Sequence, residues 1–200
     1  RAARALLDGP AVGGAPEAWP PWLAPHQIPA AERLSGILAG HGGALLADAV
    51  GLGKSYVALA VALARDEPFS LVVPAVLVPQ WRALLARFDA EAPIITHESL
   101  SVASIRLTDY PPNRLFVVDE AHRFRNPDTN RHRALARLAV GALGLLVTAT
   151  PVHNRLADLF HLFRLFLRDH ALAALGVPSL RCAARGEIDA SLIAGAAARL

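Results

Sequence analysis

An α/β fold is predicted by this sequence, with a parallel β-sheet that helices cover on both faces. Three observations predict it. Short apolar runs of strand length alternate along the chain with longer segments of helical pattern. The runs are apolar throughout, as expected where both faces of a sheet are buried. Glycine and proline separate the segments, and polar residues gather directly after several of the apolar runs.

The first half of the predicted fold begins after a loose lead-in, residues 1–24, that is rich in glycine and proline. Pro29 falls in the first turn of the first expected helix, where proline is tolerated. Pro74 stops the second expected strand, and Pro79 lies in the opening turn of the next helix. In order, the expected elements are helix Pro25–Leu38, strand Ala44–Ala47, helix Tyr56–Arg65, strand Phe69–Val73, helix Val78–Phe88 and strand Ile94–Thr96.

The second half continues the alternation of strands and helices. Its expected elements are strand Leu115–Val118, a basic helix Asn130–Val140, strand Leu143–Val147, helix Leu156–Arg168 and further helix toward Leu200. We therefore divide the chain into the lead-in, one lobe over residues 25–168, and a helical extension over residues 169–200.

Composition limits the classes of protein to consider. Of the 200 residues, 54% are hydrophobic and 18% charged, which fits a packed globular domain and argues against disorder. The best candidate for a membrane span, Leu156–Leu167, is short and interrupted by three polar or charged residues, so no membrane partner is expected. The single cysteine, Cys182, excludes an intrachain disulfide and fits the reducing cytoplasm.

Charge and chain ends give two weaker indications. The net charge of +3 permits a nucleic-acid partner without requiring one. The chain contains no methionine, and we expect it to be a piece of a longer protein.

One lysine stands out among the twenty basic residues, because all the others are arginine. This residue, Lys54, ends the run Gly51-Leu52-Gly53-Lys54 and is followed by Ser55. The run lies between an expected strand and an expected helix, which is the context of a phosphate-binding loop. In such a loop, backbone N–H groups converge on phosphate oxygens, the lysine reaches the β- and γ-phosphates, and the serine hydroxyl can ligate Mg²⁺.

The run departs from the usual phosphate-loop pattern at one position. The form G-x-x-x-x-G-K-[ST] needs glycine five residues before Gly53, where this chain has Asp48. Gly-Leu-Gly also occurs in ordinary turns, so the loop alone leaves the interpretation open.

Two further polar clusters follow expected strands: Asp119-Glu120-Ala121-His122 and Thr148-Ala149-Thr150-Pro151. Beside a phosphate loop, Asp119 can hold Mg²⁺ and Glu120 can orient and deprotonate the attacking water. Taken alone, the first cluster favours an acidic cap, and the second favours an ordinary strand exit. The carboxyl ends of parallel strands share one edge, where open α/β sheets bind ligands. Together the clusters favour a nucleotide site.

These motifs, in this order and spacing, resemble the first RecA-like lobe of superfamily-two helicases, which is a P-loop NTPase lobe. The closer resemblance is to the Swi/Snf-type double-stranded-DNA translocases, whose phosphate loop typically has aspartate at the position of Asp48. Bacterial members, among them the RNA-polymerase-recycling ATPase, resemble it most. The resemblance runs from about Leu23 to Phe166. The segments that carry it are Pro25-His26-Gln27, Asp48–Ser55, Val72–Pro74, Val78–Trp81, Thr96–Leu100, Asp119–His122, Phe124–Asn126 and Thr148–Asn154.

The resemblance implies an ATP hydrolase that uses ATP and Mg²⁺ to move along duplex DNA without separating its strands. It implies that Gln27 reads the adenine edge, and that the catalytic residues are Lys54, Asp119 and Glu120. The residues that it places around the nucleotide are Gln27, Gly51, Leu52, Gly53, Lys54 and Ser55, with Ser55 and Asp119 serving Mg²⁺. Coupling to DNA and to a second lobe falls to His122, Thr148 and Thr150. The residues expected near the DNA backbone are Pro74, Gln80, Thr96 and Ser99.

Two departures from the family's pattern bear on activity. Ala49 stands where family members usually carry glutamate, so a carboxylate beside the phosphate loop is lost. After Pro151 the sequence shows no second series of strands and helices, whereas such a motor closes a second RecA-like lobe over the nucleotide. That lobe supplies arginine fingers, and such a residue contributes roughly 10³–10⁵ in rate in related enzymes. We therefore expect this chain alone to bind ATP weakly, hydrolyse it very slowly and not translocate.

Two other functions stay open at this point. One is a lobe of a single-strand-directed RNA or DNA helicase. The other is a non-catalytic nucleotide-binding module that docks a partner, for which Ala49 and the missing lobe are the arguments. The expected partners of the motor are duplex DNA, the second lobe, and a DNA-bound protein such as RNA polymerase.

A group of arginines and one tryptophan allow a functional and a structural interpretation. A basic cluster could follow a phosphate backbone or form a solvated helix face, and its members are Arg123, Arg125, Arg131, Arg133 and Arg137. Trp81 could stack on a base, but its position beside Leu84 and Leu85 favours the core.

Overall fold

The computed structural model describes residue 16 and residues 18–49, 51–102, 114–150, 156–173 and 176–187. Most of the predicted lead-in, Pro151 of the last motif and the end of the predicted helical extension lie outside these residues. Within the described part of the chain, no helix combines the length and the apolar character that crossing a membrane requires.

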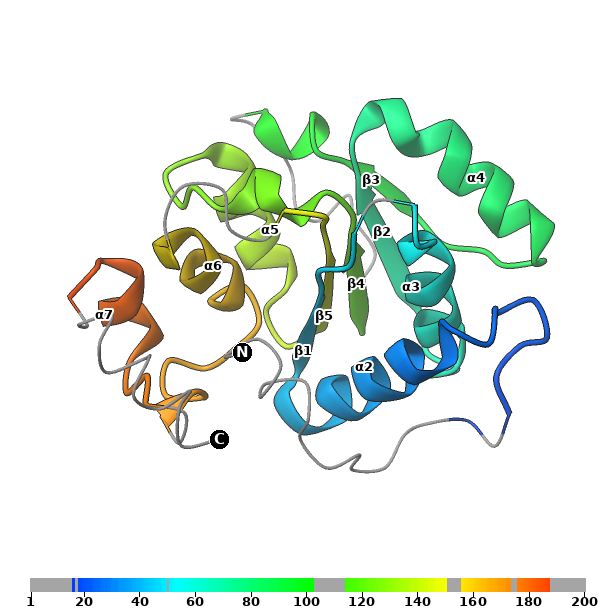
Figure 1. Cartoon of the computed structure of the whole chain (residues 1–200). Helices are drawn as coiled ribbons and strands as arrows, with labels where there is room; N and C mark the ends of the chain where they lie inside the picture. The colour runs from blue at the N-terminus through cyan, green and yellow to red at the C-terminus, as the bar shows by residue number, and fades with distance from the viewer. Residues whose placement is uncertain are drawn as a thin grey trace.

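The fold is built on a five-stranded parallel sheet, as predicted, with the strand order β1-β5-β4-β2-β3 (Figure 1). The order places β5 between β1 and β4, so the segments that leave these three strands emerge next to one another. The strands are β1 Gly43–Leu46, β2 Phe69–Val73, β3 Ile94–Thr96, β4 Leu115–Val118 and β5 Leu143–Val147.

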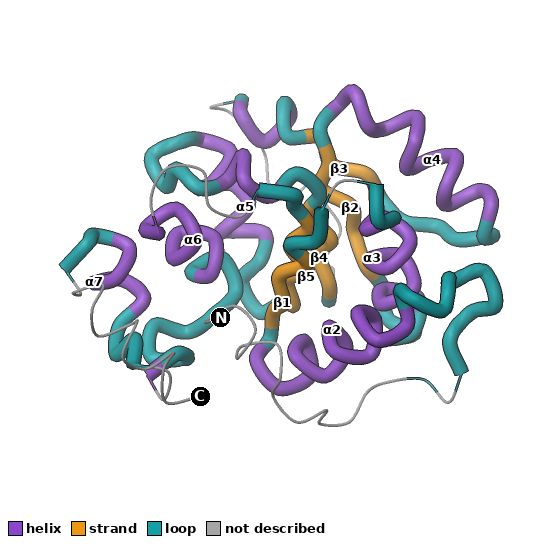
Figure 2. The backbone as a smooth tube through the Cα atoms, in the orientation of Figure 1, coloured by secondary structure: helices purple, strands orange, loops and turns teal. Residues whose placement is uncertain are grey.

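Helices cover both faces of the sheet, and Figure 2 shows the two helical layers on either side of the strands. One face packs against α2 Ile28–His41, α3 Lys54–Leu63 and α4 Val78–Arg87. The other packs against α5 Asn130–Leu138 and α6 Leu156–Phe163. Alternate residues of a strand serve the two cores, because side chains alternate across a sheet. Leu71 and Val73 belong to the first core, and Val72 to the second.

A third apolar cluster joins α6 to α7 Leu180–Ala184 at the end of the described chain. Phe166, in the turn after α6, lies over Gly43 of β1 and Gly144 of β5. A Cβ atom at Gly43 would overlap its ring, and one at Gly144 would crowd it. The two glycines therefore open the sheet surface for an aromatic side chain.

The sequence predicted the bounds of β2, β3, β4 and β5 correctly, and the remaining differences have local causes. Helix α2 begins at Ile28 rather than Pro25, with Pro29 in its first turn. Helix α6 ends at Phe163 rather than Arg168, because residues 164–166 form a turn that returns Phe166 to the sheet. Helix α3 begins at Lys54, directly after a left-handed glycine.

Candidate active site

The segments that follow β1, β4 and β5 leave the sheet at the same level. Leu46 is the register partner of Val147, and the Thr148 N–H donates to the Leu46 carbonyl at 3.0 Å. The Asp119 N–H donates to the carbonyl of Val72 in β2 at 2.9 Å. These backbone bonds bring the three predicted motifs to one edge of the sheet.

The phosphate-loop segment is shaped by two glycines and by Gln27. Gly51 and Gly53 have φ values of +88° and +72°, which glycine adopts at little steric cost. The Gln27 amide nitrogen donates to the Leu52 carbonyl at 3.0 Å, and its oxygen accepts from the Ala24 N–H at 3.1 Å. A Cβ atom at residue 53 would overlap this amide nitrogen. The structure therefore places Gln27 against the phosphate-loop segment, and its reading of the adenine edge stays a prediction.

Lys54 turns its ammonium back onto the loop. Its Nζ donates to the carbonyls of Asp48 and Ala49, both at 2.8 Å. Ser55 follows in the first turn of α3 and is half-buried. Two backbone carbonyls of the loop thus hold the ammonium beside the loop.

Asp119 is a buried carboxylate with a donor on each oxygen. Its Oδ1 accepts from the Glu120 N–H and its Oδ2 accepts from the Trp81 indole N–H, both at 2.9 Å. Burial raises the pKa of Asp119 above its ordinary value. The Trp81 and Glu120 donors and the positive charge of Lys54 act in the opposite direction. Lys54 and Asp119 therefore lie within electrostatic reach, although they are far apart in the chain.

Glu120 connects to the segment after β5 through a histidine. One Glu120 carboxylate oxygen lies 3.1 Å from His122 Nδ1, and the same nitrogen lies 3.1 Å from the Thr148 hydroxyl. The Thr148 hydroxyl also accepts from the Thr150 N–H at 3.2 Å. The predicted catalytic glutamate and the three predicted coupling residues thus form one continuous polar chain.

The residues expected near DNA divide into two places. Thr96 and Ser99 share a turn after β3, where the Ser99 N–H donates to the Thr96 hydroxyl at 3.1 Å and the Ser99 hydroxyl to the Thr96 carbonyl at 2.8 Å. Gln80 lies exposed in the first turn of α4, while Pro74, directly after β2, is buried.

Several features of the site were not predicted from the sequence. Trp81 was expected in the core, where the structure places it, but its bond to Asp119 was not foreseen. A hollow of about 280 Å³ beside the acidic motif is lined by His122, Arg123, Arg125, Asn126 and Arg131. The apolar pattern gives no signal for the bond, because it joins distant elements. The hollow itself was not predicted, but its three arginines belong to the basic cluster that the sequence singled out.

His97 is a fully buried histidine after β3. Neither of its ring nitrogens has a hydrogen-bond partner, and the ring meets the edge of Phe124. Burial lowers the pKa of His97 from 6.5 to about 4, and the charges of Arg123 and Arg131 act in the same direction. The Val72 carbonyl opposes the shift, although it lies outside hydrogen-bond geometry.

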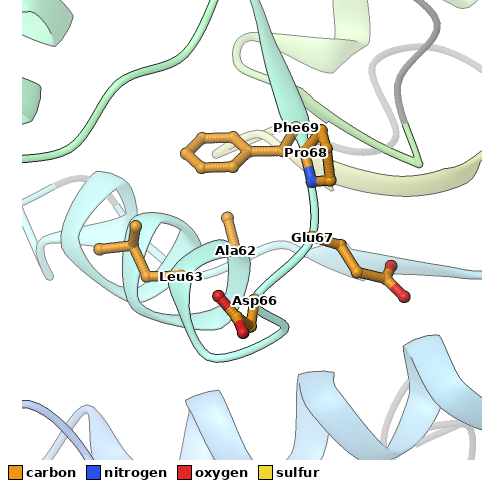
Figure 3. Close-up of a pocket in the computed structure, with 6 residues that line it drawn as sticks. All are labelled: Ala62, Leu63, Asp66, Glu67, Pro68 and Phe69. Carbon is orange, nitrogen blue, oxygen red and sulfur yellow. The ribbon is translucent and has the colours of Figure 1, made fainter.

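A second cavity lies away from the polar edge, between the end of α3 and the start of β2 (Figure 3). It has a volume of about 270 Å³. Its charged lining residues are Asp66 and Glu67, and a phosphate would be repelled there. The charge of this cavity therefore does not suit a nucleotide, and the polar edge at the opposite end of the sheet is the candidate site.

The chain is similar to known proteins of the SNF2 type. A family model described as the SNF2-related domain matches residues 87–174. The matched segment contains the acidic motif and the Thr-Ala-Thr motif, and the phosphate loop precedes it. An uncharacterized ATP-dependent helicase, YqhH of Bacillus subtilis (strain 168), is 30% identical over 167 residues, which are 73% of this chain and 29% of that protein.

The chain is similar to the SNF2-related family of superfamily-two helicases. A chromodomain-helicase-DNA-binding protein 1-like of Danio rerio is 27% identical over 172 residues, covering 70% of this chain and 17% of that protein. Among solved structures, the Sulfolobus solfataricus SWI2/SNF2 ATPase core in complex with dsDNA aligns with a TM-score of 0.61 and 22% identity. That alignment covers 78% of this chain and 38% of the other, and it confirms the RecA-like fold. The chain thus spans less than a third of the curated SNF2-related relatives named here.

Proposed function

We propose that this SNF2-related lobe binds ATP with Mg²⁺ and hydrolyses it as part of a motor that moves along duplex DNA. The observation that carries the proposal is that the segments bearing Lys54, Asp119 and Glu120 lie at one edge of the sheet. The charge of Lys54 acts there on the Asp119 carboxylate, and the Glu120 N–H donates to it. An ammonium, a buried carboxylate and a half-exposed carboxylate are the groups that phosphate binding, metal binding and water activation require.

The oxygen donors at this edge fit Mg²⁺. The ion prefers hard oxygen ligands and keeps several waters, so one carboxylate and one hydroxyl suffice beside the nucleotide's phosphates. Asp119 and Ser55 would hold it. When bound, the ion neutralises negative charge on the β- and γ-phosphates.

The roles of the remaining residues follow from their contacts. Binding of ATP requires Lys54 to exchange its two carbonyl partners for phosphate oxygens. Glu120 accepts the proton of the attacking water, and His122 holds its carboxylate. The contacts of Glu120 differ with and without the γ-phosphate. The hydrogen bonds of His122, Thr148 and Thr150 transmit this difference to the segment after β5.

We propose that DNA contacts the side of the lobe formed by the ends of β2 and β3. Gln80, Thr96 and Ser99 would face the phosphate backbone, with Pro74 setting the backbone between β2 and α4. The arginine-lined hollow beside His122 extends this surface, since the structure gives Arg123, Arg125 and Arg131 no ion pair with any described acidic residue. The Sulfolobus SWI2/SNF2 core that shares this fold was solved in complex with dsDNA, which favours duplex over single strands as the substrate proposed here.

We further propose that a second RecA-like lobe completes the motor, since the chain spans less than a third of those relatives. Without it, this chain should bind nucleotide and turn it over only very slowly. The protein displaced from DNA, such as RNA polymerase, and the cytoplasmic location remain part of this proposal.

Nucleotide binding by the 200-residue chain tests the central part of the proposal. A fluorescent ATP analogue titrated in the presence of Mg²⁺ should bind the wild type, and Lys54→Ala should weaken binding by about 10-fold or more, because a charge-assisted contact is worth about 1.5–3 kcal/mol. Arg82→Ala removes an exposed cation from α4 and serves as the matched control. Equal affinity for all three chains would contradict the proposed site.

The choice among motors needs a polypeptide in which this lobe is joined to a second lobe. Duplex DNA should stimulate its ATPase activity more than single-stranded DNA or RNA does. Stimulation by single strands alone would support the strand-separating helicase instead. A nucleotide-binding module without catalysis would show no stimulation by any nucleic acid.

A further inference from the structure

The buried indole of Trp81 reaches the carboxylate at the centre of the site. Trp81 lies in α4, fully buried beside Leu84 and Leu85, and its Nε1 is 2.9 Å from Asp119 Oδ2. The two residues are 38 positions apart in the sequence. Because an indole has a single N–H donor and no acceptor, this bond uses all of Trp81's hydrogen-bonding capacity.

The bond has a role that the other donor to Asp119 cannot fill. Oδ1 accepts from the N–H of Glu120, which is the next residue and moves with Asp119. Trp81 belongs to a separate helix that is packed in the first core. The Trp81 bond therefore ties the carboxylate to an element outside its own loop, and the two donors together fix its rotamer and plane.

Both carboxylate oxygens keep a lone pair after these bonds are made, because a carboxylate offers about four acceptor positions. Their directions are set by the donors on the other positions. A carboxylate that is buried without such donors would be free to rotate and would be desolvated without compensation. Trp81 supplies the compensation from the side of the core, which leaves the opposite side of the carboxylate for another ligand.

We propose that Trp81 is a positioning residue for the divalent cation that accompanies the nucleotide, acting through Asp119. The inference rests on the proposed nucleotide site and adds a residue to it. Trp81 does not touch the cation or the phosphates. It holds the Asp119 carboxylate in the orientation that the cation requires, as outer partners of metal ligands commonly do.

The variant Trp81→Phe tests this, because it keeps an aromatic ring in the core and removes the N–H. In the 200-residue chain, the Mg²⁺ concentration at half-maximal binding of the fluorescent ATP analogue should rise about 10-fold, as expected when a metal ligand loses the donor that orients it. Nucleotide binding in excess EDTA should be unchanged. Trp22→Phe, which alters a ring stacked on Phe88, is the matched control and should leave the Mg²⁺ requirement unchanged.

A double-mutant cycle shows whether Trp81 acts through Asp119. In an Asp119→Ala background, which has no side-chain acceptor for the indole N–H, Trp81→Phe should have no further effect on the Mg²⁺ requirement. An equal effect in both backgrounds would mean that the tryptophan acts through general packing, and the inference would be overturned.

A spectroscopic measurement needs neither the metal nor a stable Trp81→Phe variant. The chain has three tryptophans, so a ¹⁵N-labelled sample gives three indole N–H resonances. One of them should exchange slowly with solvent and should move when Asp119 is replaced by asparagine. Three rapidly exchanging resonances, or none that responds to Asp119→Asn, would overturn the inference.

The outcomes separate this inference from the proposed function. If the wild type binds nucleotide with a clear Mg²⁺ requirement that Trp81→Phe leaves unchanged, only the role of Trp81 is lost. If the wild type binds no nucleotide under any condition, the proposed site fails, and the inference fails with it.

Discussion

Two parts of the same sheet edge are organised in different ways. In the nucleotide part, formed by the segments after β1, β4 and β5, side chains bond across elements that are distant in sequence, as Trp81 does to Asp119 and His122 to Thr148. In the β2–β3 part, which carries Thr96, Ser99 and Ser101, each hydroxyl bonds to backbone within its own turn. The first part is a network of side chains. In the second, the hydroxyls bond locally, and the bonds to distant segments each involve one backbone group, as from the Ala75 N–H to Glu98 and from Asn130 to the Ser101 carbonyl.

The difference predicts how far the effects of a substitution should extend through the structure. In a network, removing one side chain leaves a distant partner unsatisfied, so effects are large and non-additive. In a local turn, the loss stays within a few residues. The following predictions test this contrast, from the largest expected effect to the smallest.

Glu120→Gln should have the largest effect. In a polypeptide with both lobes, single-turnover ATP hydrolysis should fall about 10²–10⁴-fold, because an amide cannot accept the water's proton. Nucleotide binding should be nearly unchanged. Glu91→Gln, at an exposed position before β3, is the matched control. Hydrolysis at the wild-type rate would show that Glu120 is outside the reaction and that the polar chain to Thr148 serves another purpose.

His97 should make the stability of the β2–β3 part depend on pH. Its pKa of about 4 in the folded chain lies below the ordinary 6.5. The unfolded chain therefore takes up this proton first, and stability is lost as pH falls from 6.5 to 4, by about 3 kcal/mol in total at 1.4 kcal/mol per unit.

Chemical denaturation between pH 7 and 4.5 measures this loss. His97→Leu should lose less stability on acidification than the wild type, and His41→Leu, at an exposed residue, is the control. Some acid sensitivity should persist, because burial also lowers the pKa of His132 and of His161. Parallel curves for wild type and His97→Leu would show that His97 can be protonated without unfolding.

Gly53→Ala should destabilise the nucleotide part by about 2 kcal/mol, since a left-handed non-glycine residue costs about 1–2 kcal/mol and the new methyl group would overlap the Gln27 amide. Adding Gln27→Ala to this variant should restore only the part of the lost stability that the overlap causes. Thermal unfolding measures both. Gly40→Ala, with open space around it in α2, should be neutral or slightly stabilising. A harmless Gly53→Ala would mean that this loop rearranges freely.

Thr96→Ala and Ser99→Ala should have the smallest effects. Each removes a neutral hydrogen bond worth about 1 kcal/mol, so duplex-DNA affinity should fall no more than about 5-fold. Fluorescence anisotropy with labelled duplex measures this, with Ser101→Ala as control. Nucleotide binding should not change. A clear loss of nucleotide binding would show that the two parts of the edge are energetically coupled, and the contrast between them would not hold.

The contrast also explains what sequence reasoning could reach. The first and last residues of strands β2 to β5 were predicted correctly, because turn-forming residues at both ends of an apolar run mark where the strand begins and ends. Motifs that follow strands could be placed at one edge, since parallel topology determines where strands end. The ends of helices α2 and α6 were wrong by several residues, because the chain there depends on contacts of Gln27 and Phe166 with distant segments.

The bond between Trp81 and Asp119 was out of reach for the same reason. A tryptophan beside leucines in a helix indicates burial, and that prediction was confirmed. The direction of its N–H depends on how α4 lies against the sheet, which no local pattern specifies.

Glu120 has a φ of +49°, which is uncommon for a residue with a Cβ atom. Glycine would adopt this backbone without strain, so Glu120→Gly should relieve about 1 kcal/mol of backbone strain, while it removes the contact with His122. The same change would remove the proposed proton acceptor. Selection for thermal stability alone would therefore favour loss of the proposed proton acceptor. Engineering of a more stable variant should keep Glu120 unchanged.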